Sequence, residues 1–172
     1  MASDMILALH SDASYLSEPE SNSRASGHFY LSKNKYEIFN NGDVMKRSKI
    51  IKHVLASASE AETAALFYNC KAAITLRLTL EEMRHLQPKN PVTSDNTAAL
   101  GLIKNTMIPK SAKFYDMRFN FLKYRQAQNQ FDMLWRKGTS NRADYHTKKH
   151  PTKHYVLKRG DYVVDIPQAL KQ

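Results

Sequence analysis

Cysteine is almost absent from this sequence, which has only Cys70 in 172 residues. A single cysteine excludes an internal disulfide framework and any zinc site built from several thiolates, and it suits a reducing compartment. Long apolar runs are also missing, since none approaches the roughly 20 residues that a membrane-spanning helix needs. The N-terminus lacks the basic-then-apolar pattern of a signal peptide. We therefore expect an intracellular protein, cytoplasmic or nuclear, with no membrane partner.

Glycine and proline are scarce as well, with 5 and 6 residues, whereas 42% of the sequence is hydrophobic. This composition argues against wholesale disorder, and the length is that of one domain with a sizeable core. Cys70 lies among apolar neighbours in a predicted helix, so we expect it in that core.

Acidic residues are scarce in one part of the chain. Residues 104–159 contain 14 of the 26 Lys and Arg but only 3 of the 16 Asp and Glu, and the remainder is close to neutral. A basic segment joined to a neutral remainder is typical of a protein that binds a polyanion, most often nucleic acid. The alternative is a solvated surface with an incidental bias.

The hydrophobic pattern alternates between strands and helices. A helix start is indicated at Ser57, because Glu60 follows at the spacing of a capping box. A helical crossover between two strands makes those strands parallel. In chain order the pattern predicts a buried strand at 5–9, a loop at 17–26, strands at 27–32 and 48–56 around a turn at 40–43, a helix at 57–85, a strand at 91–95, helices at 96–103 and 111–128, a strand at 130–136, a helix at 141–148 and a weak strand at 161–166.

Carboxylates recur where these elements begin or end. Asp12 follows the first strand, Glu60 and Glu62 open the long helix, Asp95 ends a later strand, and Asp144 lies on the last predicted helix. Element ends can meet at one edge of a mixed sheet. Oxygen ligands without cysteine favour Mg²⁺ or Mn²⁺ over zinc. Taken singly, each acid could instead have a structural role, since an aspartate after a strand commonly caps a turn.

Four short segments carry a family resemblance. They resemble the four successive motifs of the ribonuclease H domain of copia-type LTR retrotransposon polyproteins. The stretches 113–119 and 130–138 are similar to the part of that family that connects its third and fourth motifs. Any one motif is weak, whereas four in the same order are specific. The motifs are His10-Ser-Asp-Ala-Ser-Tyr15, Ser57-Ala-Ser-Glu-Ala-Glu62, Thr93-Ser-Asp-Asn-Thr-Ala98 and Asn141-Arg-Ala-Asp-Tyr-His-Thr-Lys148.

The resemblance implies an α/β, ribonuclease H-like fold. Its five-stranded mixed sheet would have three antiparallel strands followed by parallel ones, with helices on its faces. Residues 1–150 would form this domain. Residues 151–172 would be a basic C-terminal tail that either packs on the domain or lies on the nucleic acid.

The resemblance also implies the chemistry. The expected activity is hydrolysis of the RNA strand of an RNA–DNA hybrid, and a reverse transcriptase domain in a parent polyprotein is an expected partner. Two Mg²⁺ or Mn²⁺ ions are implied as cofactors. The implied metal ligands and catalytic residues are Asp12, Glu62, Asp95 and Asp144, with Glu60 as the alternative to Glu62.

If the substrate is an RNA–DNA hybrid, its contacts with the protein can also be predicted. Polar groups beside the metal ligands can contact the 2′-hydroxyl that distinguishes RNA from DNA. Basic residues on and before the helix at 111–128 can follow a phosphate backbone. The candidates for the first role are Ser14, Asn96 and Thr97, and those for the second are Lys110, Lys113, Arg118 and Arg125.

Two further patterns carry alternatives. His146, His150 and His154 are spaced by four, but Pro151 interrupts any helix that would align them, which disfavours a zinc site. The aromatic side chains of Trp135, Tyr145 and Tyr155 could stack on bases, although their strand and helix positions favour a place in the core.

Two rival functions share the fold. One is a catalytically inactive, basic nucleic-acid-binding module. The other is a DNA-cutting enzyme of the integrase and transposase kind, in which a glutamate is expected where this chain has Asp144. The segment 136–141 also lacks the histidine that many ribonucleases H carry there.

Overall fold

The computed structural model describes residues 5–33, 42–104 and 117–163. Within them five strands form one sheet in the order β3-β2-β1-β4-β5. The strands are β1 (Ile6–Glu18), β2 (Asn22–Ser32), β3 (Met45–Ile51), β4 (Asn90–Ser94) and β5 (Phe131–Trp135). The helices are α1 (Ala58–Glu82), α2 (Thr97–Ile103), α3 (Met117–Ala127) and α4 (Thr152–Lys158).

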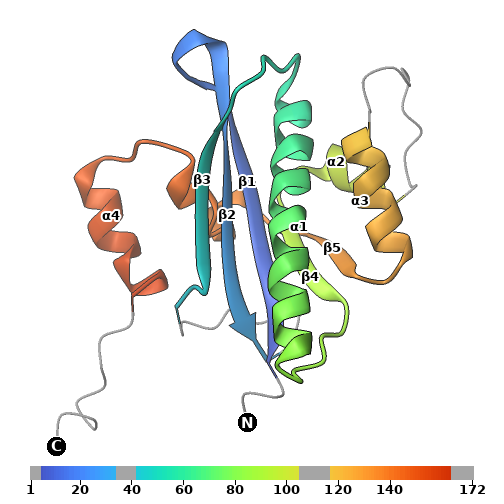
Figure 1. The fold of residues 1–172 in the computed structure, drawn as a ribbon. Helices are drawn as coiled ribbons and strands as arrows, with labels where there is room; N and C mark the ends of the chain where they lie inside the picture. Colours follow the sequence, from blue (N-terminus) through green and yellow to red (C-terminus); the bar gives the residue numbers. More distant parts are fainter. Residues whose placement is uncertain (1–4, 34–41, 105–116, 164–172) are drawn as a thin grey trace, which may run out of the picture.

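The sheet confirms the predicted α/β architecture. β1, β2 and β3 are antiparallel, whereas β1, β4 and β5 are parallel. Figure 1 shows α1 lying along the sheet, with α2 and α3 beyond it on the same side and α4 on the other side. The described part of the predicted helix at 111–128 is α3. Two predicted phosphate contacts, Lys110 and Lys113, lie outside the described residues.

The alternation of side chains along β1 assigns its residues to the two faces. Leu7 and Leu9 belong to the core cluster that includes α1 residues such as Leu66 and Cys70. Asp12 has the opposite parity, and its carboxylate accepts a hydrogen bond from Thr147 beyond the sheet. The predicted core position of Cys70 is therefore confirmed.

The start of α1 has the capping box that the sequence predicted. The Ser57 hydroxyl accepts a hydrogen bond from the Glu60 backbone N–H at 3.1 Å. The Glu60 carboxylate in turn accepts one from the Ala56 N–H at 2.8 Å. The first bond satisfies a helix-end donor, and the second ties the Glu60 side chain to the residue before the cap, so Glu60 is committed to the helix start.

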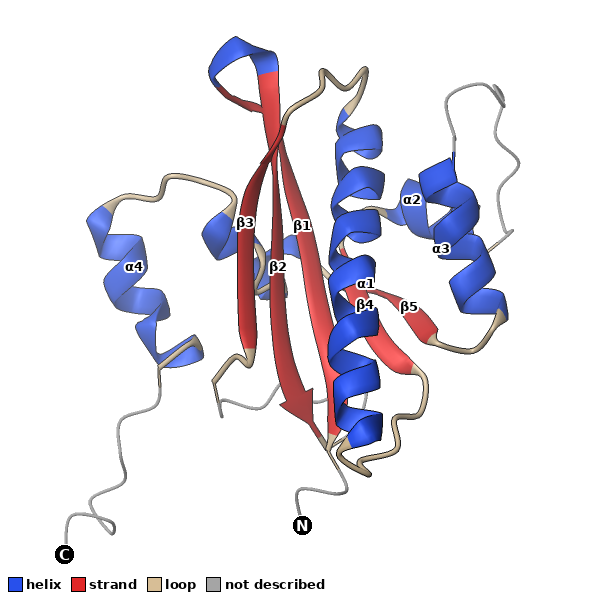
Figure 2. Ribbon diagram, viewed as in Figure 1, coloured by secondary structure: helices blue, strands red, loops and turns tan. Residues whose placement is uncertain are grey.

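The predicted loop at 17–26 is wrong. β1 continues to Glu18 and β2 begins at Asn22, so only a turn at Pro19–Ser21 separates them. Arg24 and Glu18 form an ion pair across the two strands, with 2.7 Å between Nε and Oε1. The two strands are held together here by backbone hydrogen bonds, which do not require apolar side chains. The polarity of the segment was therefore a poor indicator of a loop. Figure 2 shows the hairpin extending past β4 and β5.

The predicted helix at 141–148 is also wrong. Within it a short 3₁₀ turn forms at Asp144–His146, and another precedes it at Gly138–Ser140. The segment is instead held to β1: the Asn141 amide donates to the Ser11 carbonyl at 2.9 Å, and the Arg142 N–H donates to Nδ1 of His10 at 2.9 Å. These tertiary hydrogen bonds outweigh local helix propensity.

The tail after Pro151 contains structure that the sequence did not indicate. α4 covers Thr152–Lys158, and a 3₁₀ turn at Arg159–Asp161 occupies the start of the weakly predicted strand, whose last residues lie outside the described ranges. Tyr162 anchors this part, because its hydroxyl donates to the Arg142 carbonyl at 2.7 Å and its ring lies 4.5 Å from that of Tyr145.

Candidate active site

β1 extends beyond its parallel neighbour, and this offset opens the site. The β1–β4 pairing is limited to Leu9 with Val92 and His10 with Thr93. Past that point one edge of β1 has no strand partner. The Glu62 carboxylate fills part of the opening, because its Oε1 accepts a hydrogen bond from the Ala13 N–H at 3.0 Å.

Three carboxylates converge at this opening. Asp12, Glu62 and Asp95 each offer an oxygen, and these oxygens lie within 4.8 Å of one another. Asp12 is 3% exposed and Glu62 is 9% exposed, whereas Asp95 is half-buried directly after β4. The second carboxylate oxygen of Glu62 is buried and has no hydrogen-bond partner among the described residues. An all-oxygen donor set with an unsatisfied buried acceptor fits a hard divalent cation.

Burial, together with neighbouring negative charge, raises the pKa values of Asp12 and Glu62. Burial is the largest cause for Asp12, whose pKa rises to about 7, and the charges of Asp144 and Asp95 add to it against a lowering hydrogen bond from Thr147. Burial also raises the pKa of Glu62 to about 9, helped by the charges of Asp12 and Asp95. Without a cation, the cluster therefore holds a proton at neutral pH.

The fourth predicted acid, Asp144, lies beside this group rather than in it. Its carboxylate forms an ion pair with Lys148, and its Oδ2 lies 4.0 Å from Nε2 of His150. Asp144 and Asp95 nevertheless line the same cavity, of about 590 Å³, together with Lys148. The structure thus brings three of the four predicted acids together and places the fourth in the wall of a cavity that Asp95 also lines.

Sequence comparison shows what this chain is similar to. No family model matches the chain. Its sequence is 27% identical over 155 residues to the retrovirus-related Pol polyprotein from transposon TNT 1-94 of Nicotiana tabacum, which covers 90% of this chain and 11% of the polyprotein. The chain thus spans only about a tenth of that relative.

Solved structures share the fold at low sequence identity. LC11-RNase H1 in complex with an RNA/DNA hybrid superposes with a TM-score of 0.60 at 12% identity, over 81% of this chain and 92% of that one. The N-terminal RNase H domain of a Mycobacterium tuberculosis protein gives 0.57 at 13% identity, over 83% and 91%. The chain has the fold of ribonuclease H structures, and its sequence is similar to a transposon Pol polyprotein. The resemblance read from the four motifs is confirmed at that level.

Sequence reasoning missed a residue that holds Asp12 in the ribonuclease H-like domain. The Thr147 hydroxyl donates to Oδ2 of Asp12 at 2.5 Å, and the Thr147 carbonyl accepts from the Ser14 hydroxyl at 2.9 Å. Ser14, predicted to contact nucleic acid, is therefore buried and engaged internally. The available signal was the position of Thr147 inside the fourth motif, three residues after Asp144.

The other predicted nucleic-acid contacts have different surroundings. The Asn96 side chain caps α2 by accepting from the Ala99 N–H at 2.9 Å, while Thr97 is exposed beside it. Arg125 lies over the Phe121 ring at 5.1 Å on its own helix. Arg118 is half-exposed near the start of α3, and its charge helps to lower the pKa of His53.

Trp135 is not in the core, contrary to the prediction. It is 57% exposed, because it ends the edge strand β5, and its indole Nε1 donates to the Asp95 carbonyl at 3.1 Å. Tyr145 and Tyr155 are half-buried and pack together with 5.0 Å between ring centroids.

The three spaced histidines, His146, His150 and His154, do not belong to any group of three possible metal ligands among the described residues. His150 and His154 stack at 4.0 Å between ring centroids, while His146 packs on Tyr145. In the part of the chain that the structure describes, the carboxylate group is the one that can hold a metal ion. No helix there is both long and apolar enough to cross a membrane.

The Gly138→Ala substitution should weaken cation binding while leaving the fold intact. A Cβ at this position would lie 2.7 Å from Oδ2 of Asp95, so the carboxylate must turn away from the cluster. We expect the affinity for Mn²⁺ or Mg²⁺, measured by calorimetry, to fall about tenfold, as is usual when a ligand loses its orientation. Gly160→Ala is the matched control, because a Cβ there meets no atom within 4 Å. Equal affinities for the two variants would contradict this placement of Asp95.

Proposed function

We propose that this domain is a metal-dependent endonuclease that hydrolyses the RNA strand of RNA–DNA hybrids. The observation that carries the proposal is the convergence of Asp12, Glu62 and Asp95 within 4.8 Å on a ribonuclease H-like fold. Two Mg²⁺ or Mn²⁺ ions would be held by these acids, with Asp144 serving the second ion from the cavity wall. Such ions activate an attacking water and stabilise the charge on the leaving oxygen.

The chain's own groups would set the geometry of this reaction. Asp12 lies on a central strand and is fixed by Thr147, and Glu62 is fixed by the Ala13 N–H. Ligands held by regular elements and by a second layer of hydrogen bonds are pre-organised for a cation with strict geometry. The Lys148 ammonium keeps Asp144 oriented at the cavity.

The polyprotein relative suggests where the substrate comes from. The relative from Nicotiana tabacum is described as a Pol polyprotein of a transposon, and one structural neighbour was solved with an RNA/DNA hybrid. We infer that a reverse transcriptase domain in a parent polyprotein produces the hybrid that this domain degrades.

The test is a comparison of three duplexes. The purified chain is incubated with end-labelled RNA–DNA hybrid, RNA duplex and DNA duplex, each with Mg²⁺ and with a chelator. We expect the RNA strand of the hybrid to be cut only with Mg²⁺, to products with a 5′-phosphate and a 3′-hydroxyl. Binding of the hybrid without cleavage would favour the inactive module, and cutting of DNA would favour an integrase-like enzyme.

A further inference from the structure

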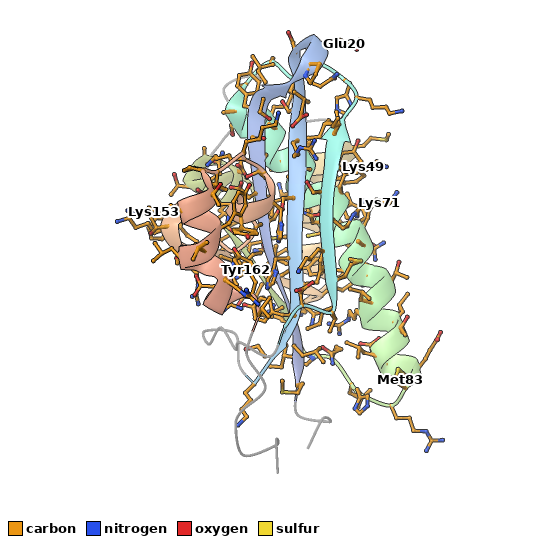
Figure 3. The ribbon with its side chains drawn as sticks, turned by 90° about the vertical axis from the view of Figure 1, so that its left-hand side faces the viewer. Glu20, Lys49, Lys71, Met83, Lys153 and Tyr162 are labelled. Atoms are coloured by element: carbon orange, nitrogen blue, oxygen red, sulfur yellow. The ribbon has the colours of Figure 1, made fainter. Side chains whose placement is uncertain are left out.

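The segment after Pro151 helps to form a second cavity, on the side of the sheet opposite α1 (Figure 1). Its volume is about 330 Å³, which is at the lower end of the range for small-ligand sites. We call this cavity, formed by Lys46 of β3 and by residues between 145 and 163, the tail pocket. Figure 3 shows Tyr162 between α4 and the strands, whereas Lys153 of α4 points away from them.

Three tyrosine rings, none of them fully buried, line the tail pocket. Tyr145 packs against Tyr155 and Tyr162, with 5.0 Å and 4.5 Å between ring centroids. The Tyr155 hydroxyl accepts a hydrogen bond from the His150 N–H at 3.2 Å, and the Tyr162 hydroxyl donates to the Arg142 carbonyl at 2.7 Å. The rings are therefore fixed in place. Fixed and partly exposed aromatic rings are the surfaces on which nucleobases stack.

The lining of the tail pocket is positively charged, and no Asp or Glu is among the described residues that form it. Arg159 is exposed and makes no ion pair with any described residue. Lys46 is the second cation, and Asp43 pairs with it at 3.1 Å. Nε2 of His146 is buried and has no hydrogen-bond partner among the described residues. This lining complements a nucleotide, because the rings suit its base and the guanidinium of Arg159 suits its phosphate.

The tail pocket adjoins the cavity that Asp95 and Asp144 line. Tyr145 and Tyr162 line both cavities, so these two rings form the partition between them. A strand with its scissile phosphate at the carboxylates therefore has the tail pocket beside it. In a duplex the bases are paired and stacked on one another, so only a single-stranded extension has bases free to enter.

Packing of the tail is a simpler explanation for part of this cluster. The tyrosines bury one another and attach α4 to the sheet, and single exposed apolar residues are common on protein surfaces. Packing does not explain a cavity beside the rings with an unpaired guanidinium at Arg159. It also does not explain why Val156 lines that cavity although it is 71% exposed. A protein partner is another possible occupant, but a lining with cations and no acid favours a polyanion.

We propose that the tail pocket binds a nucleobase from a single-stranded extension of the RNA strand, with Arg159 at the adjoining phosphate. This inference rests on the proposed function, because it assumes that the RNA strand of a hybrid lies at the carboxylates. The pocket would hold the place where the RNA strand leaves the duplex. The domain would then prefer hybrids with an RNA extension to blunt hybrids.

The test compares a blunt hybrid with hybrids that carry a single-stranded RNA extension of about six nucleotides at the 5′ or the 3′ end. Affinities are measured by fluorescence anisotropy in a chelator, so that no strand is cut. We expect the parent to bind one of the extended hybrids about tenfold more tightly than the blunt one, an effect of the size that stacking of one base produces. Abasic residues in that extension should remove most of this gain.

Two variants with the same change of charge locate the gain on the protein. Val156→Glu places a carboxylate in the lining of the tail pocket and should abolish the gain. Leu157→Glu is the matched control, because Leu157 is the next residue of α4, is 79% exposed and lines neither cavity. It should keep the gain. Both variants should bind the blunt hybrid within twofold of the parent, and thermal melting confirms that each is folded.

A second pair of variants tests the phosphate contact. Arg159→Gln should reduce the gain about threefold and lower the slope of log K against log salt by about 1 on the extended hybrid. Lys153→Gln removes the same charge from α4 outside the tail pocket and should leave the gain unchanged.

Three results would overturn the inference. They are a parent that gains from neither extension, which would leave the tail pocket to a protein partner, a gain that persists without bases, and an equal loss in Val156→Glu and Leu157→Glu. Cleavage of the blunt hybrid by the parent would support the proposed function in each of these cases. A parent that neither binds nor cuts the blunt hybrid would contradict the proposed function itself.

Discussion

Asp95→Asn is expected to abolish hydrolysis of the hybrid while leaving the fold unchanged. The amide is the same size as the carboxylate but is a far weaker ligand for a hard cation. Loss of one metal ligand should cost the transition state about 4 kcal/mol, or roughly 10³-fold in rate. The fold should persist, because the Asp95 backbone carbonyl keeps its hydrogen bond from Trp135.

The measurement is single-turnover cleavage of a labelled hybrid with Mg²⁺, together with circular dichroism and thermal melting. Glu82→Gln is the matched control, since Glu82 is exposed near the C-terminal end of α1, the end remote from Glu62. The control should cut at the parent rate. Parent-like cleavage by Asp95→Asn would remove Asp95 from the active site.

Glu62→Gln is expected to stabilise the metal-free protein at alkaline pH. The folded-state pKa of Glu62, about 9, lies above its ordinary value of 4.5. Between these values the folded state keeps a proton that the unfolded state has lost, so rising pH favours unfolding. Below about pH 4 both states are protonated and no penalty exists. Glutamine removes the penalty while its Oε1 can still accept from the Ala13 N–H. At pH 8 the gain should be on the order of a few kcal/mol.

Asp12 adds to the same trend over a lower range, because its pKa rises from 3.8 to about 7. The metal-free parent should therefore lose stability steadily from about pH 5 to pH 9. A divalent cation binds the ionised form and displaces the protons, so Mg²⁺ should raise the parent's Tm more at pH 8 than at pH 6. Glu62→Gln should gain little from Mg²⁺ at either pH.

These stabilities are measured by chemical denaturation from pH 5 to pH 9, with and without Mg²⁺. Glu60→Gln is a close control, because it makes the same chemical change two residues away on the same helix. Glu60 caps the helix through the Ala56 N–H, and glutamine can accept the same bond, so its pH profile should follow the parent. A Glu62→Gln profile parallel to the parent would show that Glu62 is not buried beside Asp12.

Local patterns in the sequence predicted much of the fold and where the acids would lie. The apolar run before Asp12 indicated a buried strand, and Ser57 with Glu60 indicated the helix start that the structure contains. Such features depend on residues close together in the chain. Polarity was taken for a loop at 17–26, but backbone pairing of β2 with β1 on one side and with β3 on the other decided the outcome instead.

By itself the sequence determined the order of the elements and placed an acid at the end or start of several of them, because periodicity and capping are local properties. Only the tertiary structure decided which acids meet. The offset between β1 and β4 lets Glu62 reach Asp12 and Asp95, and hydrogen bonds to β1 hold 141–147 in turns rather than a helix. Register and packing join residues far apart in the chain, so no local pattern contains them.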